Sequence, residues 1–160
     1  MNLYSKTKSN REPVQTIVTR RHEIPYALLA WTDGACEPNP GAGGWGYSIQ
    51  TLTDDVLSES SGGDVETTNN RMELMGVIQA IRDPIGRDKK LIVCTDSQLT
   101  LLCAIGRWKR KTNLDLWADL DDACQGRFIV FEWWRGHIGT AGNERADELA
   151  AIGRAEALEA

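Results

Sequence analysis

The sequence lacks the features that would assign it to a membrane, secreted or repeat class. No apolar run approaches the roughly 18 residues that a membrane-spanning helix needs, and residues 1–21 are too polar for a signal peptide. Internal repeats and low-complexity tracts are also absent. We therefore expect a cytoplasmic protein with no membrane partner. Nothing in the sequence indicates a protein partner, so we expect a monomer.

Cysteine is too sparse to hold this chain together. Its four cysteines have neither metal-ligand spacing nor the density of a disulfide framework; they are Cys36, Cys94, Cys103 and Cys124. We expect reduced thiols that pack in the core. A phosphate-binding P-loop is excluded as well, because no Lys-Ser or Lys-Thr pair follows the Gly/Pro-rich stretch 37–44.

Positive charge is scarce outside the N-terminus. The formal net charge is −5, but residues 1–25 hold five Lys or Arg against two Glu, which leaves 13 basic and 21 acidic residues beyond. A polyanion partner normally favours a basic body, so this balance argues mildly against nucleic acid. Acids clustered at a metal site would produce the same balance.

The length of 160 residues fits one domain with a single core. We expect a basic, flexible arm over residues 1–23, a folded domain over residues 24–157 and a short tail over residues 158–160. A basic arm can help to hold an anionic strand, but a solvated tail explains the same composition.

Hydrophobic periodicity predicts an α/β protein. The expected strands cover residues 26–31, 45–52, 56–62, 91–95 and 128–134, and the expected helices cover residues 69 or 70 to 81, 97–108, 114–124 and 140–157. The first three strands form an antiparallel meander. The first, fourth and fifth strands are joined through helices, so these neighbours should be parallel.

Four acidic residues stand in comparable positions. Asp33 and Asp96 each follow a buried strand, and parallel pairing would bring them about 5 Å apart. Three of the four acids also have a simpler interpretation. Asp33 could be a turn residue, Asp96 a helix N-cap, and Glu73 part of a capping box with Asn70. Asp147 is harder to explain structurally, because Asp is a poor mid-helix residue.

If these acids converge, they form a cage of oxygen ligands without a His or Cys cluster, which suits Mg²⁺ or Mn²⁺. Two such ions about 4 Å apart can support phosphoryl displacement. His137 lies between glycines just after the fifth strand, where it could transfer a proton or merely face solvent.

Six blocks of the sequence, taken in order, resemble the signature blocks of type 1 ribonuclease H. They are Thr32-Asp33-Gly34, Asn39-Pro40-Gly41, 67–74, Thr95-Asp96-Ser97-Gln98, Gly136-His137 and 143–150. The resemblance implies a ribonuclease H-like fold whose mixed five-stranded sheet has the order 3-2-1-4-5, with strand 2 antiparallel and helices on both faces. It also implies two-metal, Mg²⁺-dependent cleavage of the RNA strand of an RNA/DNA hybrid, which leaves 5′-phosphate and 3′-hydroxyl ends. Asp33, Glu73, Asp96 and Asp147 match the metal-binding acids, and His137 matches a mobile histidine that assists turnover.

The same resemblance assigns Asn39, Asn69 and Gln98 to the groove that senses the hybrid, and Thr68 to a pocket for a DNA-strand phosphate. Amides can donate to and accept from a ribose 2′-hydroxyl, which separates RNA from DNA. A hydroxyl beside helix N-terminal amides suits a phosphate. Asn69 and Asn70 are candidates both for helix capping and for hybrid binding.

One departure from the family concerns substrate affinity. Many members carry a long basic protrusion where this chain has only residues 107–113. We expect the basic arm and four cationic side chains to compensate in part; these are Arg107, Lys109, Arg110 and Lys111. Trp108 is the best candidate to lie against a sugar-phosphate backbone.

Two other functions remain open at this point. One is a ribonuclease H-like module that binds nucleic acid without cutting it, and its mark would be loss of a metal-binding acid. The other is another nuclease or strand-transfer enzyme on the same fold. Such enzymes generally need a separate DNA-binding domain, for which this chain has no room.

Overall fold

The computed structural model describes residues 15–16 and 24–160. The strands are β1 (Gln15–Thr16), β2 (Leu28–Cys36), β3 (Gly41–Gln50), β4 (Val56–Thr67), β5 (Leu91–Thr95) and β6 (Ile129–Trp133). The helices are α1 (Asn69–Arg82), the 3₁₀ turn η2 (Pro84–Gly86), α2 (Gln98–Ala104), α3 (Leu114–Cys124) and α4 (Ala141–Glu159). Most of the expected arm, residues 1–14 and 17–23, lies outside the described residues.

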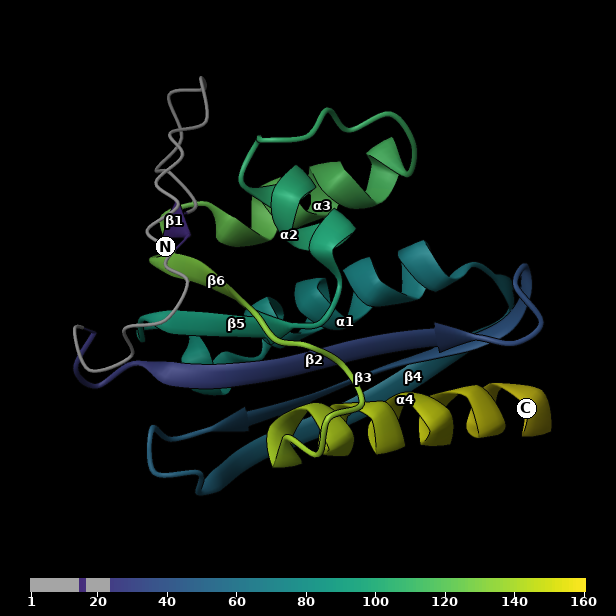
Figure 1. The fold of residues 1–160 in the computed structure, drawn as a ribbon, viewed down its shortest axis with the longest axis horizontal. Coiled ribbons are helices and arrows are strands. Elements are labelled where there is room, and N and C mark those ends of the chain that lie inside the picture. Colours follow the sequence, from purple (N-terminus) through teal and green to yellow (C-terminus); the bar gives the residue numbers. More distant parts are fainter. Residues whose placement is uncertain (1–14, 17–23) are drawn as a thin grey trace.

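A six-stranded mixed sheet of order β1-β6-β5-β2-β3-β4 forms the centre of the protein (Figure 1). β2 pairs parallel with β5 and antiparallel with β3, and β5 pairs parallel with β6. The predicted five-stranded order is therefore confirmed. The sequence did not predict the additional edge strand β1, whose two residues pair parallel with β6.

Helices cover both faces of the sheet, and alternation along β2 assigns its side chains to the two faces (Figure 1). Leu28 and Ala30 belong to the larger core, to which α1, α2 and α3 contribute. Leu29 and Trp31 belong to a smaller core on the opposite face, which includes Ala146 of α4. This arrangement brings α1 and α4 to opposite faces of the same central strands.

The predicted boundaries are wrong at three places. β2 continues through Asp33 to Cys36, so Asp33 lies within the strand and does not begin a turn. β3 and β4 extend to Gly41 and Thr67, because glycines that look like loop residues in the sequence pair across this hairpin. α2 ends at Ala104 and not at Trp108, since Gly106 follows with a positive φ of 77°.

Two glycines of β3 let α4 approach the sheet closely. A Cβ at Gly44 would lie 2.1 Å from Ala150 O and 2.3 Å from Arg154 N. A Cβ at Gly46 would lie 2.4 Å from Leu149 Cβ. Because no larger residue fits at either position, the glycines fix the depth at which α4 packs, and with it the placement of Asp147.

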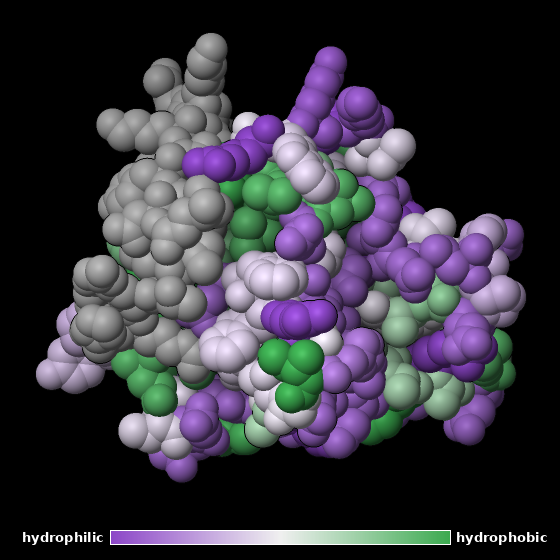
Figure 2. Space-filling view, viewed as in Figure 1, coloured by the Kyte–Doolittle hydropathy of each residue, from purple (hydrophilic) through white to green (hydrophobic). Residues whose placement is uncertain are grey.

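Hydrophilic side chains dominate the face seen in Figure 2, and the hydrophobic ones form small separate patches. Hydrophilic side chains also project at the top of this view, where Figure 1 places the loop between α2 and α3. None of the helices in residues 24–160 combines the length and apolar character that crossing a bilayer requires.

Candidate active site

Strand register brings Asp33 and Asp96 to the same level of the sheet. β2 and β5 pair in parallel up to Trp31 opposite Cys94. Each acid lies two residues beyond this last pair, Asp33 within β2 and Asp96 just after β5. Asp33 is buried and accepts a hydrogen bond at Oδ1 from Gly34 N at 2.9 Å. Ser97, not Asp96, is the N-cap of α2, so the Asp96 carboxylate is not used for capping.

Glu73 reaches the site because α1 crosses β2 in close contact. A Cβ at Gly34 would lie 2.2 Å from Glu73 N, so only glycine permits this approach. The capping-box interpretation of Glu73 is wrong. The N-cap of α1 is Thr68, whose hydroxyl accepts from Arg71 N at 3.3 Å.

Three of the four predicted acids form a tight cluster, which we call the acidic cluster: Asp33, Glu73 and Asp96. Each offers a carboxylate oxygen, and these oxygens lie within 4.8 Å of one another. Asp147 is not part of this tight group, but it lines the same cavity of about 350 Å³, and its charge acts on Asp33. His137 also lines this cavity.

Burial and the crowding of like charges raise the pKa of two acids of the cluster, Asp33 and Glu73. Burial, followed by the nearby Asp96 carboxylate, raises the pKa of Asp33 from 3.8 to about 7. Burial and the charges of Asp33 and Asp96 likewise raise the pKa of Glu73 well above its usual value. Glu73 Oε2 is buried and has no hydrogen-bond partner. The cluster thus favours a bound proton or a cation.

The donor set fits a hard divalent cation. Every member is a carboxylate, and no histidine or cysteine belongs to the cluster formed by the described residues. A divalent ion would neutralise the repulsion and give the unpartnered Glu73 oxygen a ligand to bind. Divalent metal use is therefore consistent with both the chemistry and the geometry of the site.

Two of the predicted substrate-binding amides lie around the acidic cluster. Asn69 and Asn70 line the cavity. Asn69 accepts at Oδ1 from Cys36 N at 2.6 Å, and its own N–H donates to Asn39 Oδ1 at 3.2 Å. Gln98 is exposed at the start of α2 and does not line the cavity.

The four predicted cations of the α2–α3 loop do not behave alike. Arg107, Lys109 and Lys111 are exposed, as is Trp108 at 49%. Arg110 instead turns inward. We call residues 106–113 the basic loop.

Arg110 makes contacts on both sides of the basic loop. Its guanidinium donates to Cys103 O at 3.1 Å and to Asp121 Oδ2 at 2.7 Å, and it lies 4.5 Å from the centre of the Trp117 ring. These contacts hold Arg110 within the protein, although it also lines the hollow beneath the loop, and its predicted substrate contact stays a prediction. Its role is to anchor the loop between α2 and α3.

Beneath the basic loop lies a second cavity of about 270 Å³. Leu74, Leu99 and Trp117 form part of its apolar wall, while Lys109 and Lys111 line it as well. Asn70 lines both this cavity and the acidic one. The two hollows therefore adjoin at the N-terminal end of α1.

Sequence reasoning overlooked Asn143 as part of the site. This side chain is 4% exposed and donates from Nδ2 to Asp96 Oδ2 at 3.3 Å. It precedes Asp147 by four residues, which puts both on the same face of α4. That spacing was the available signal, and α4 thus orients Asp96 of the acidic cluster while carrying Asp147, which lines the same cavity.

A mixed α/β sheet with a carboxylate cluster beyond the paired ends of its parallel strands defines a protein with a divalent-cation site. The sequence model of RNase H matches residues 25–155. The ribonuclease H of Paracoccus denitrificans is 43% identical over 145 residues, which cover 81% of this chain and 93% of the relative. The chain therefore belongs to the ribonuclease H family, as the resemblance predicted.

Solved structures agree with this assignment. LC11-RNase H1 in complex with an RNA/DNA hybrid superposes with a TM-score of 0.72 at 30% identity, covering 82% of this chain and 99% of that one. The N-terminal ribonuclease H domain of a Mycobacterium tuberculosis protein superposes with a TM-score of 0.73 at 28% identity, covering 84% and 97%. The predicted fold class is confirmed.

Proposed function

We propose that this protein hydrolyses the RNA strand of RNA/DNA hybrids with Mg²⁺ as its metal cofactor, leaving 5′-phosphate and 3′-hydroxyl ends. The acidic cluster is the observation that carries this proposal, together with a ribonuclease H1 of the same fold that is seen bound to a hybrid. The cytoplasmic location, the monomeric state and the division into arm, domain and tail stay predictions.

Asp33, Glu73, Asp96 and Asp147 would hold two divalent ions. When bound, such ions supply Lewis acidity at the scissile phosphate and lower the pKa of water. In the reaction, water adds to phosphorus and the bond between phosphorus and the 3′-oxygen breaks. The departing 3′-oxygen takes a proton, which gives the 3′-hydroxyl end.

The other residues of the site hold the acids and the substrate. Asn143 and Gly34 N orient the Asp96 and Asp33 carboxylates by donating hydrogen bonds. His137 lies at the cavity with an imidazole that can accept and donate a proton, and we assign it to turnover. Asn69 and Asn70 face the same space, where amides can recognise a ribose 2′-hydroxyl.

Several further substrate contacts complete the proposal. Thr68, Asn39 and Gln98 would contact the hybrid around the cavity. Lys109 and Lys111 line the adjoining hollow, which suits a phosphodiester strand that continues past Asn70. Arg107 and Trp108 are exposed on the same loop.

The direct test is cleavage of end-labelled RNA/DNA, RNA/RNA and DNA/DNA duplexes with Mg²⁺, Mn²⁺ or a chelator. We expect the RNA of the hybrid to be cut with a metal ion and to stay intact with the chelator. Asp96→Asn should lower kcat roughly 10³-fold or more, since electrostatic stabilisation worth several kcal/mol depends on the acids.

Asp88→Asn is the matched control, because Asp88 is exposed and lies just before β5, at the end opposite Asp96. It should keep full activity. Binding of the hybrid without cleavage would instead support the non-catalytic module. Cutting of DNA/DNA would support another nuclease on this fold.

A further inference from the structure

The turn between β2 and β3 carries Asn39, which we have proposed as a hybrid contact. The two ends of this turn are Glu37 and Ala42, which we call its neck. They are joined by a hydrogen bond from Glu37 N to Ala42 O at 3.0 Å. Pro38 and Pro40 flank Asn39 and have no N–H, so the turn has few backbone donors with which to fix its own shape. Its conformation must therefore depend on donors from elsewhere.

One contact comes from the start of α1 and another from the end of β2. The N–H of Asn69 donates to Asn39 Oδ1 at 3.2 Å. The thiol of Cys36 lies 3.2 Å from Pro38 O and 3.3 Å from Gly41 O, so it can donate to either carbonyl. The first contact holds the turn against the start of α1, and the second ties the turn to the end of β2.

The third contact comes from α4. The Arg154 guanidinium donates from Nε to Ala42 O at 3.1 Å and from Nη2 to Glu37 O at 2.5 Å. Arg154 thus bridges the two residues that form the neck of the turn. Among the described residues Arg154 forms no ion pair with an acid, and its guanidinium donates to these carbonyls instead.

Close packing brings Arg154 to this place. Its backbone N would be only 2.3 Å from a Cβ at Gly44, which shows how closely α4 lies on β3 at this position. In Figure 1 the turn after β2 and the C-terminal part of α4 lie at the same end of the molecule. The helix that carries Asp147 also carries Arg154, two turns further on.

We infer that Arg154 is a positioning residue for substrate recognition, which acts by fixing the turn that presents Asn39 to the hybrid. This inference rests on the proposed function and deepens it. Arg154 contacts no acid of the cluster, so its loss should weaken recognition while leaving the chemical step unchanged. KM should therefore change and kcat should not.

Steady-state cleavage of an RNA/DNA hybrid with Mg²⁺ tests the inference. We expect Arg154→Met to raise KM roughly five- to tenfold, within the range that loss of one ordinary hydrogen bond produces, with kcat within about twofold. Arg154→Lys keeps the charge but not the fork that spans two carbonyls, so its KM should be intermediate.

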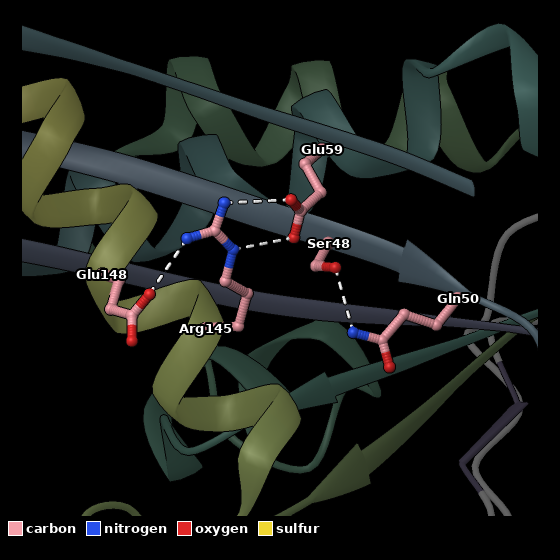
Figure 3. Close-up of polar contacts among 5 residues, drawn as sticks. All are labelled: Ser48, Gln50, Glu59, Arg145 and Glu148. Carbon is pink, nitrogen blue, oxygen red and sulfur yellow. Dashed lines mark hydrogen bonds and ion pairs between the residues drawn. The ribbon is translucent and has the colours of Figure 1, made fainter. Parts of the chain in front are cut away.

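A double-mutant cycle separates positioning from general destabilisation. If Arg154 acts through Asn39, then Arg154→Met adds nothing to the KM of Asn39→Ala. The matched control is Arg145→Met on the same helix. Arg145 pairs with Glu59 of β4 and with Glu148 (Figure 3). Its side-chain hydrogen bonds go to these two acids and not to the turn. Its KM should equal that of the unchanged protein.

Three results would overturn the inference: an unchanged KM in Arg154→Met, additive effects in the double variant, or an equal rise in KM for Arg145→Met. A protein that cleaves no hybrid at all would contradict the proposed function and this inference together. Cleavage with an unaltered KM contradicts the inference alone.

Discussion

The acidic cluster and the basic loop differ in how the fold supports them. The acids lie on β2, α1 and the end of β5, where close backbone contacts hold them in a partly buried cavity. The exposed cations of the basic loop lie on a short connection between α2 and α3. Arg110 and its partners bind that loop to α2 and α3, and Arg71 of α1 donates to Asn113 at the end of the loop. The fold holds the like charges of the acidic cluster close together, whereas the exposed cations of the basic loop can move apart.

This difference shows that charge in a sequence does not report function directly. Arg107, Lys109, Arg110 and Lys111 look equivalent in the sequence, yet Arg110 stabilises the fold and the other three face solvent. The four acids are far apart in the sequence, yet all of them line one cavity and three of them form a tight cluster. In each case the supporting backbone decides which role a charge takes.

The largest effect should come from removing charge at the cluster. In metal-free protein at pH 8, Asp33→Asn should raise the free energy of unfolding by roughly 1 to 4 kcal/mol. The pKa of Asp33 is raised in the folded state to about 7 from 3.8, so its ionisation opposes folding. Protonated Asp33 stabilises the folded state relative to the unfolded state. This contribution is fully present below pH 3.8 and is lost as the pH rises through about 7.

Urea unfolding with a chelator at pH 5 and pH 8 measures this difference. The gain of Asp33→Asn should shrink at pH 5, where Asp33 is protonated in the folded protein. Saturating Mg²⁺ should reduce the gain at pH 8, because the ion stabilises the unchanged protein by binding its folded state. The electrostatic explanation would be contradicted if Asp33→Asn were less stable than the unchanged protein at pH 8. It would also be contradicted if the gain in free energy of unfolding were the same at pH 5 and pH 8.

An intermediate effect is expected at the basic loop. Replacing Arg107, Lys109 and Lys111 together by Gln should weaken hybrid binding roughly tenfold. The slope of log K against log salt should fall by at most about 0.9 for each lost phosphate contact. Binding by the Asp96→Asn protein across a salt series provides the measurement.

A charge-matched control lies just before β5, at the end of the strand opposite Asp96. Arg87, Lys89 and Lys90 are exposed and comprise one Arg and two Lys, as in the loop. Replacing them by Gln should leave the salt slope unchanged. If both triple variants lose affinity equally, the effect comes from net charge and not from the basic loop.

The smallest effect should come from Arg110. Arg110→Met should lower the free energy of unfolding by about 1 kcal/mol, because a half-buried ion pair and a cation–π contact are lost. At equal folded fraction the salt slope should stay unchanged, since Arg110 already pairs with Asp121. A salt slope reduced as in the triple variant would show that Arg110 also contacts phosphate.

The five main strands and four helices could be predicted because each has a strong local pattern. β5 and α3 match their predicted limits of 91–95 and 114–124, since buried apolar runs and helical periodicity mark them clearly. The glycine-rich ends of β3 and β4 were missed because glycine has low strand propensity and only pairing across the hairpin makes these residues extended.

The candidate site was predictable in part for the same reason. Asp33 and Asp96 follow apolar runs, and parallel pairing alone aligns them. The contacts of Asn143, Cys36 and Arg154 join residues far apart in the chain, so no local pattern could show them.

The sequence by itself determined the element types, the family resemblance and the four candidate acids, because these depend on residue identity and local periodicity. Only the tertiary structure decided that three acids form a tight group with Asp147 beside them. It also decided that Arg110 turns inward and that Arg154 holds the turn of Asn39. These outcomes depend on how closely helices approach the sheet, which glycines such as Gly34 and Gly44 permit and which no single segment encodes.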